Sequence, residues 1–191
     1  MKNQNNPTAK TVKNGFVQRL VIGAMFAAVY VVLASFLSVN LGVMQVSFAS
    51  FAIILGGLLL GMPDIILLSF CAAFLEQRLY GFSPTTVLWL LPTLIQGIFV
   101  GLCSYVPTQG KSHIKTAVQT IIIVALAELL LTGANIAALY LDANIMGYTV
   151  KAMSAKHPMR IANAAGRIVV NSVLVLLLLP KLRKITKAGK K

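Results

Sequence analysis

Apolar runs that are long enough to cross a lipid bilayer occupy most of this chain. Residues 160–180, RIANAAGRIVVNSVLVLLLLP, form one run, and residues 16–39 form another. A helix needs about 20 mainly apolar residues to span the hydrocarbon core of a membrane. Of the 191 residues, 58% are hydrophobic and 11% are charged, whereas about a quarter of a soluble domain is charged. The sequence therefore predicts an all-α, multi-pass protein of the cell membrane, surrounded by the lipid bilayer.

The spacing of the runs predicts six transmembrane helices. Their expected ranges are 16–39, 46–61, 63–79, 84–106, 115–141 and 158–180. Pro63 and Asp64 suit the first turn of one helix, and Pro84 suits the start of the next. The chain is then expected to divide into a cytoplasmic N-terminal tail (1–15), which is polar and expected to be disordered, a six-helix transmembrane domain (16–180) and a basic cytoplasmic C-terminal tail (181–191).

Basic residues are distributed unevenly about these helices. An even number of helices places both termini on one side of the membrane, and twelve of the 17 Lys and Arg residues lie on that side. The opposite side has four, which are Arg78, Lys151, Lys156 and Arg160. Because cytoplasmic segments carry the excess of Lys and Arg, both termini are predicted to be cytoplasmic. Membrane topology thus explains the net charge of +13 better than nucleic-acid binding does.

The sequence carries no enzymatic motif. The string GKS at 110–112 resembles the end of a phosphate-binding loop, but Tyr105 stands where that loop requires glycine. There is no HExxH motif, and His113 and His157 lie in expected loops without a cluster of metal ligands. We therefore expect no catalytic residue, no metal site, no cofactor and no ATP hydrolysis by the chain itself.

Polar residues inside the expected spans mark a candidate binding site, since such residues usually face the interior of a bundle and carry function. Three spans hold them at helical spacing: Trp89, Thr93 and Gln96; Glu128, Thr132 and Asn135; Arg160, Asn163, Arg167 and Asn171. At about 1.5 Å per residue, the deepest of them lie roughly 9–20 Å below the outer surface. The stripes predict one outward-opening pocket lined by Trp89, Thr93, Gln96, Glu128, Asn135, Asn163 and Arg167, with Tyr80 and Phe82 as a hydrophobic wall or lid.

Structural interpretations of the same residues stay open. Glu128 and Arg167 could neutralise each other as a structural ion pair. Alternatively, Arg167 could bind a carboxylate of the ligand. Asn and Thr side chains often hydrogen-bond between helices without binding anything else. Trp89 also suits the aromatic belt at the membrane surface.

Small residues recur on the first expected helix. Gly23, Ala24, Ala27 and Ala28 form two small-xxx-small pairs that are one residue apart. Such spacing lets helix backbones approach closely, either within one protein or between two proteins.

Several segments resemble the substrate-binding S components of energy-coupling-factor (ECF) vitamin transporters. They are ILGGLLLGMPDIILL, LYGFSPTTVLWLLPTLIQGIFVG, GANIAALYLDANIMGY and a last helix with RI before an apolar run, and the resemblance covers residues 17–185. It implies six helices, a vitamin pocket near the outer face, and association with a membrane T component and two cytosolic ATPase subunits. The alanine motif that contacts the T component corresponds to Ala24 and Ala28, which Gly23 and Ala27 flank.

The resemblance is nearest to the pantothenate and folate type, and pantothenate is the expected vitamin. Many relatives carry Arg at the position of Gln96, so an anion-binding role is in doubt there. Folate, a pyrimidine precursor, pyridoxine and cobalamin are alternative ligands. An alternative of another class is a stand-alone, proton-coupled secondary carrier in which Glu128 is the coupling carboxylate.

Overall fold

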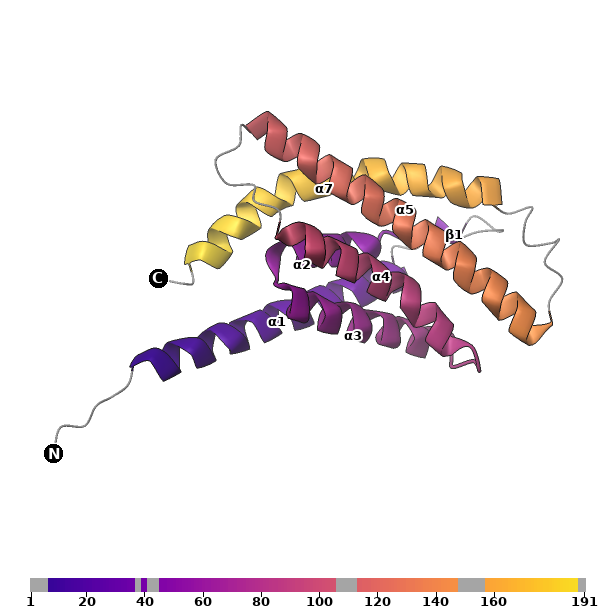
Figure 1. Cartoon of the computed structure of the whole chain (residues 1–191), viewed down its shortest axis with the longest axis horizontal. Helices are drawn as coiled ribbons and strands as arrows, with labels where there is room; N and C mark the ends of the chain where they lie inside the picture. The colour runs from indigo at the N-terminus through magenta and orange to yellow at the C-terminus, as the bar shows by residue number, and fades with distance from the viewer. Residues whose placement is uncertain (1–6, 37–38, 41–44, 106–112, 148–156, 189–191) are drawn as a thin grey trace.

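The computed structural model of the chain describes residues 7–36, 39–40, 45–105, 113–147 and 157–188. Within them the helices are α1 (Pro7–Phe36), α2 (Ser50–Leu59), α3 (Met62–Tyr80), α4 (Thr86–Ser104), α5 (His113–Met146) and α7 (His157–Ala188). The short strands β1 (Val39–Asn40) and β2 (Gln45–Val46) pair antiparallel between α1 and α2. These helices, shown in Figure 1, confirm the all-α fold class.

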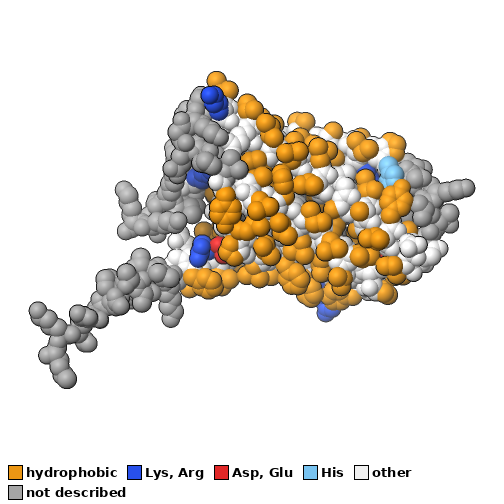
Figure 2. All heavy atoms as spheres, viewed as in Figure 1, with side chains coloured by type: hydrophobic (Ala, Val, Ile, Leu, Met, Phe, Trp, Pro, Cys, Tyr) orange, Lys and Arg blue, Asp and Glu red, His pale blue; other side chains and the backbone are white. Residues whose placement is uncertain are grey.

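Four of the helices are long and apolar enough to cross a membrane. Their apolar segments are Gly15–Phe36, Thr86–Ser104, Ile114–Met146 and His157–Arg183. α2 has ten residues and is about 15 Å long, which is half of the hydrocarbon thickness. Hydrophobic side chains cover most of the face seen in Figure 2, as expected of a surface in contact with lipid tails. The structure thus confirms a multi-pass membrane protein in which α2 is shorter than the expected span.

Both terminal helices extend into the segments expected to be tails. α1 begins at Pro7 instead of residue 16, and α7 continues through Pro180 to Ala188. Proline is well tolerated in the first turn of a helix, and Lys and Ala favour helix, so the polar residues after Pro7 continue α1. Pro180 removes one backbone hydrogen bond of α7, yet the basic residues after it are good helix formers.

The first expected helix ends earlier than residue 39, and the second begins later than residue 46. Val39 pairs with Val46, and Asn40 pairs with Gln45. β-branched valines favour the extended backbone of a strand, whereas hydrophobicity alone could not distinguish strand from helix in so short a segment.

α2 lies at the centre of the bundle and packs against α1, α3, α4, α5 and α7. All of its residues except Leu59 are buried. Two glycines bring neighbouring helices close, because a Cβ atom at Gly56 would lie 2.7 Å from Leu68 Cδ2 and one at Gly57 would lie 2.7 Å from Val100 Cγ1. The short α2 thus joins a core on its α1 and α3 side to a core on its α4, α5 and α7 side.

α3 and α4 pack side by side along a seam of small residues. A Cβ atom added at Gly101 would lie 2.7 Å from Ile65 Cγ2, and one at Gly97 would lie 2.8 Å from Ser69 Cβ. Small residues four positions apart on a helix let a neighbouring helix approach closely. Because the two helices run in opposite directions, residues beyond Ser69 on α3 lie opposite residues before Gly97 on α4.

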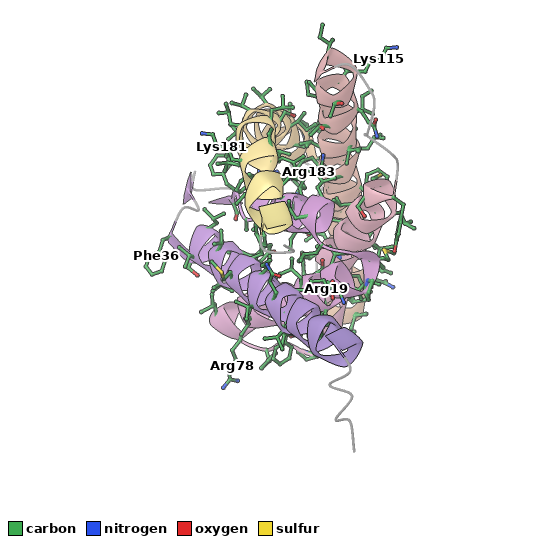
Figure 3. All side chains as sticks on the ribbon, turned by 90° about the vertical axis from the view of Figure 1, so that its left-hand side faces the viewer. Arg19, Phe36, Arg78, Lys115, Lys181 and Arg183 are labelled. Atoms are coloured by element: carbon green, nitrogen blue, oxygen red, sulfur yellow. The ribbon has the colours of Figure 1, made fainter. Side chains whose placement is uncertain are left out.

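Both chain ends lie at one end of the molecule (Figure 1). Figure 3 looks at this end and labels Arg19 on α1, Lys115 on α5, and Lys181 and Arg183 on α7. Arg78, near the end of α3, projects away from the bundle in the same view. The arrangement agrees with the uneven distribution of basic residues in the sequence.

Candidate functional site

A buried ion pair joins α5 to α7. Glu128 is fully buried, and its Oε2 lies 3.2 Å from Nε of Arg167. Arg167 also donates a hydrogen bond from Nη2 to Thr132 Oγ1, over 2.9 Å. The Nε–Oε2 contact lacks hydrogen-bond geometry, so charge attraction carries it. The periodicity of the two helices predicted these stripes, and of the two interpretations of Arg167 the structure shows the pair with Glu128.

Asn171 extends this network to the central helix. Its Nδ2 donates to Glu128 Oε1 over 2.7 Å and to Ser50 Oγ over 3.1 Å. Asn171 and Ser50 are both buried, and Ser50 is the first residue of α2. A single amide group therefore connects α7, α5 and α2. Ser50 was not predicted, because nothing in the sequence of α2 indicates which residue faces α7.

A second polar network joins α1, α3 and α4. The hydroxyl of Tyr30 donates to Glu76 Oε2 over 2.5 Å and lies 3.5 Å from Thr93 Oγ1. Thr93 belongs to the predicted stripe on α4, but Tyr30 and Glu76 were missed. A signal was available for Glu76, since it is one of only four acidic residues in the chain and lies inside an expected span.

Gln96 lies one turn from Thr93 on α4 and is 1% exposed. Neither Oε1 nor Nε2 of its amide has a hydrogen-bond partner among the described residues. A buried amide is nearly always paired, because the lost interactions with water are otherwise not replaced. Gln96 is therefore a predicted site residue whose two amide atoms both lack a hydrogen bond among the described residues.

The remaining predicted pocket residues that the structure describes are less buried and take no part in the two polar networks. Trp89, Asn135 and Asn163 are half-buried, and neither asparagine makes a side-chain hydrogen bond to another described residue. Phe82 is 51% exposed and lies against the ring of Phe74, with the Arg78 guanidinium above it. The Tyr80 side chain lies outside the described residues. A shared pocket remains a prediction for this set.

The small residues of α1 divide into two groups. Ala27 is buried, and Gly23 is half-buried, whereas Ala24 and Ala28 are exposed. Gly23, Ala24 and Ala27 line a groove together with three residues of α3, Leu67, Leu68 and Cys71. At the same groove Arg19 lies 3.6 Å from Asp64. Ala27 thus packs inside the bundle, whereas Ala24, at the open groove, and Ala28 are both exposed on α1.

A family model for the S component of ECF-type riboflavin transporters matches residues 15–180. The chain belongs to this family. No curated protein and no solved structure matches the chain significantly. The matched residues include every member of both polar networks described above, from Tyr30 on α1 to Asn171 on α7.

An S component is the substrate-binding subunit of a transporter in the cell membrane and not an enzyme. S components of ECF transporters work with a membrane T component and ATPase subunits. This division of labour explains why the chain has no phosphate-binding loop of its own. The resemblance seen in the sequence is therefore correct at the level of the family.

Proposed function

We propose that this S component captures riboflavin, or a vitamin that is likewise uncharged, from outside the cell for ATP-driven uptake. The observation that carries the choice is the ion pair between Arg167 and Glu128. A buried arginine that is already neutralised by a buried carboxylate has no free charge for the carboxylate of a vitamin. The family name supports riboflavin, which carries no net charge at neutral pH.

Pantothenate is the second candidate, because one arginine of the α7 stripe has no ion pair among the described residues. Arg160 is half-buried and lies seven residues, about 10 Å, before Arg167 along α7. A vitamin carboxylate at this level would find a cation that Glu128 does not neutralise. Pantothenate or folate would then bind nearer to the start of α7 than an uncharged vitamin would.

The topology that this function requires has both termini in the cytoplasm. The positive-inside rule supports it, and so does the grouping of the chain ends at one end of the molecule (Figure 1). The vitamin would then enter where α3 ends and α4 begins. The exposed pair Ala24 and Ala28 on α1 would contact the T component, and the two ATPases would act through that partner.

A titration of the purified protein in detergent with riboflavin, pantothenate, folate and pyridoxine tests the proposed substrate. Riboflavin is expected to raise the melting temperature, and Arg160→Gln is expected to leave its affinity unchanged. If only pantothenate or folate binds, and Arg160→Gln abolishes that binding, the argument from charge is wrong.

Uptake into proteoliposomes distinguishes the S component from a stand-alone carrier. We expect uptake only when the T component, both ATPases and ATP are present. Uptake by the purified chain alone, driven by a proton gradient and abolished by Glu128→Gln, would establish the carrier instead. The burial of Glu128 against Arg167 and Asn171 favours a structural role for this carboxylate.

A further inference from the structure

The amide of Gln96 is bonded differently from the other buried polar side chains of α4. Thr86 accepts a hydrogen bond from the backbone N–H of Ser83, and Thr93 lies within reach of the Tyr30 hydroxyl. Gln96 is more deeply buried than either threonine, yet both of its polar atoms lack a partner among the described residues. An unpaired buried amide costs free energy in the ligand-free protein, and a ligand that pairs with both of its polar atoms would remove that cost.

Other polar side chains lie near the face of α4 that carries Gln96. Positions 93 and 96 are three residues apart and therefore share a face of α4. Thr93 brings with it the Tyr30 hydroxyl and the carboxylate of Glu76. Three helices thus place a hydroxyl pair, a carboxylate and an unpaired amide within one region of the bundle interior.

We propose that Gln96 is the specificity-determining residue of the vitamin site and that it recognises a planar amide or imide edge of the ligand. This inference rests on the proposed function, because it takes the ligand to be a vitamin. A glutamine amide donates from Nε2 and accepts at Oε1, so one ligand edge with a carbonyl beside an N–H group satisfies both atoms at once. The ring system of riboflavin carries such an imide edge.

The proposal predicts opposite effects on stability and on binding. Replacing Gln96 by leucine removes an unpaired buried amide, so the ligand-free protein is expected to melt at the same temperature as the wild type or higher. The same change removes both hydrogen bonds to the ligand. A glutamine that only packs between helices would instead lower the melting temperature when it is replaced.

The test uses the full-length purified protein, riboflavin, and riboflavin methylated at its imide nitrogen. Gln96→Leu is expected to weaken riboflavin binding at least about tenfold, the cost of leaving a ligand polar group unpaired. The wild type is expected to bind the methylated vitamin more weakly than it binds riboflavin. The Gln96→Leu variant is expected to bind the two ligands with equal affinity. The control is Thr120→Val, which is expected to keep full affinity. Thr120 is buried on α5, and its hydroxyl donates to the backbone carbonyl of Thr116 in the same helix.

Four results would each overturn a part of this scheme. Equal riboflavin affinity in wild type and Gln96→Leu would refute the role of Gln96 while leaving the proposed function intact, and so would an equal effect of the methyl group in both proteins. No riboflavin binding by the wild type would refute the proposed substrate. In that case a ligand-free melting temperature of Gln96→Leu below that of the wild type would also refute the inference about Gln96.

Discussion

Nε of Arg167 lies 3.2 Å from Oε2 of Glu128, and this carboxylate is fully buried between α5 and α7. Removing one partner of such a pair leaves a buried charge without compensation. Arg167→Met is therefore expected to destabilise the protein by about 3–5 kcal/mol, the usual cost of breaking a buried pair. Thermal unfolding of the purified variant measures the effect.

The double variant Arg167→Met/Glu128→Leu removes both charges and is expected to recover most of the lost stability, since well-packed apolar pairs often replace buried ion pairs without cost. The control is Arg78→Met, because Arg78 is exposed and projects from the bundle (Figure 3). A melting temperature of Arg167→Met equal to that of the wild type would show that the pair is not structural.

The amide of Asn171 connects three helices, so its loss should cost more than the loss of its acceptor Ser50, which takes part in only one of its two hydrogen bonds. Asn171→Leu leaves Glu128 Oε1 and Ser50 Oγ without their donor, and the expected loss is about 1–3 kcal/mol. Ser50→Ala should cost less, because Nδ2 of Asn171 keeps its bond to Glu128. Equal losses in the two variants, measured by thermal unfolding, would contradict the ranking.

Gly97 allows α4 to approach α3 at Ser69. A methyl group at position 97 would lie 2.8 Å from Ser69 Cβ, which is closer than two carbon atoms can pack. Gly97→Ala is therefore expected to destabilise by about 1–3 kcal/mol. The matched control is Gly133→Ala on α5, where nothing lies within 4 Å and alanine should be neutral or stabilising.

The double variant Gly97→Ala/Ser69→Gly has the glycine on α3 instead of α4. It is expected to recover much of the lost stability, because the methyl group at position 97 no longer meets the Ser69 side chain. If the double variant melts no higher than Gly97→Ala, the destabilisation does not come from the contact between α3 and α4.

The exposed face of α1 should affect assembly and not vitamin binding. Ala24→Leu adds bulk at an exposed position, so the isolated protein is expected to keep its melting temperature and its vitamin affinity. Association with the T component and ATPases is expected to fall, because the helices can no longer approach closely. Co-purification with the partners measures this loss.

The control for this variant is Val29→Leu, which also enlarges an exposed side chain of α1 but lies on another side of the helix. If both variants assemble normally, the Ala24/Ala28 pair is not the contact with the T component.

The sequence predicted the helices more accurately than their ends. The length of the apolar runs was sufficient for the all-α membrane fold, because a span is set by the thickness of the bilayer. The continuation of α1 back to Pro7, the extension of α7 past Pro180 and the hairpin at Val39 and Val46 were not predicted. In these segments local propensity and pairing decide the structure, and apolar content carries little information.

Periodicity alone was enough to place Glu128 with Thr132 on one helix face and Arg167 with Asn171 on another, since residues three and four apart share a face of any helix. Only the tertiary structure decided that Arg167 meets Glu128, that Asn171 reaches Ser50, and that Tyr30 joins Glu76 to Thr93. It also showed that the amide of Gln96 has no partner among the described residues. These contacts depend on the rotation and relative height of packed helices. Close packing of side chains along the whole interface sets both quantities, and no single segment encodes them.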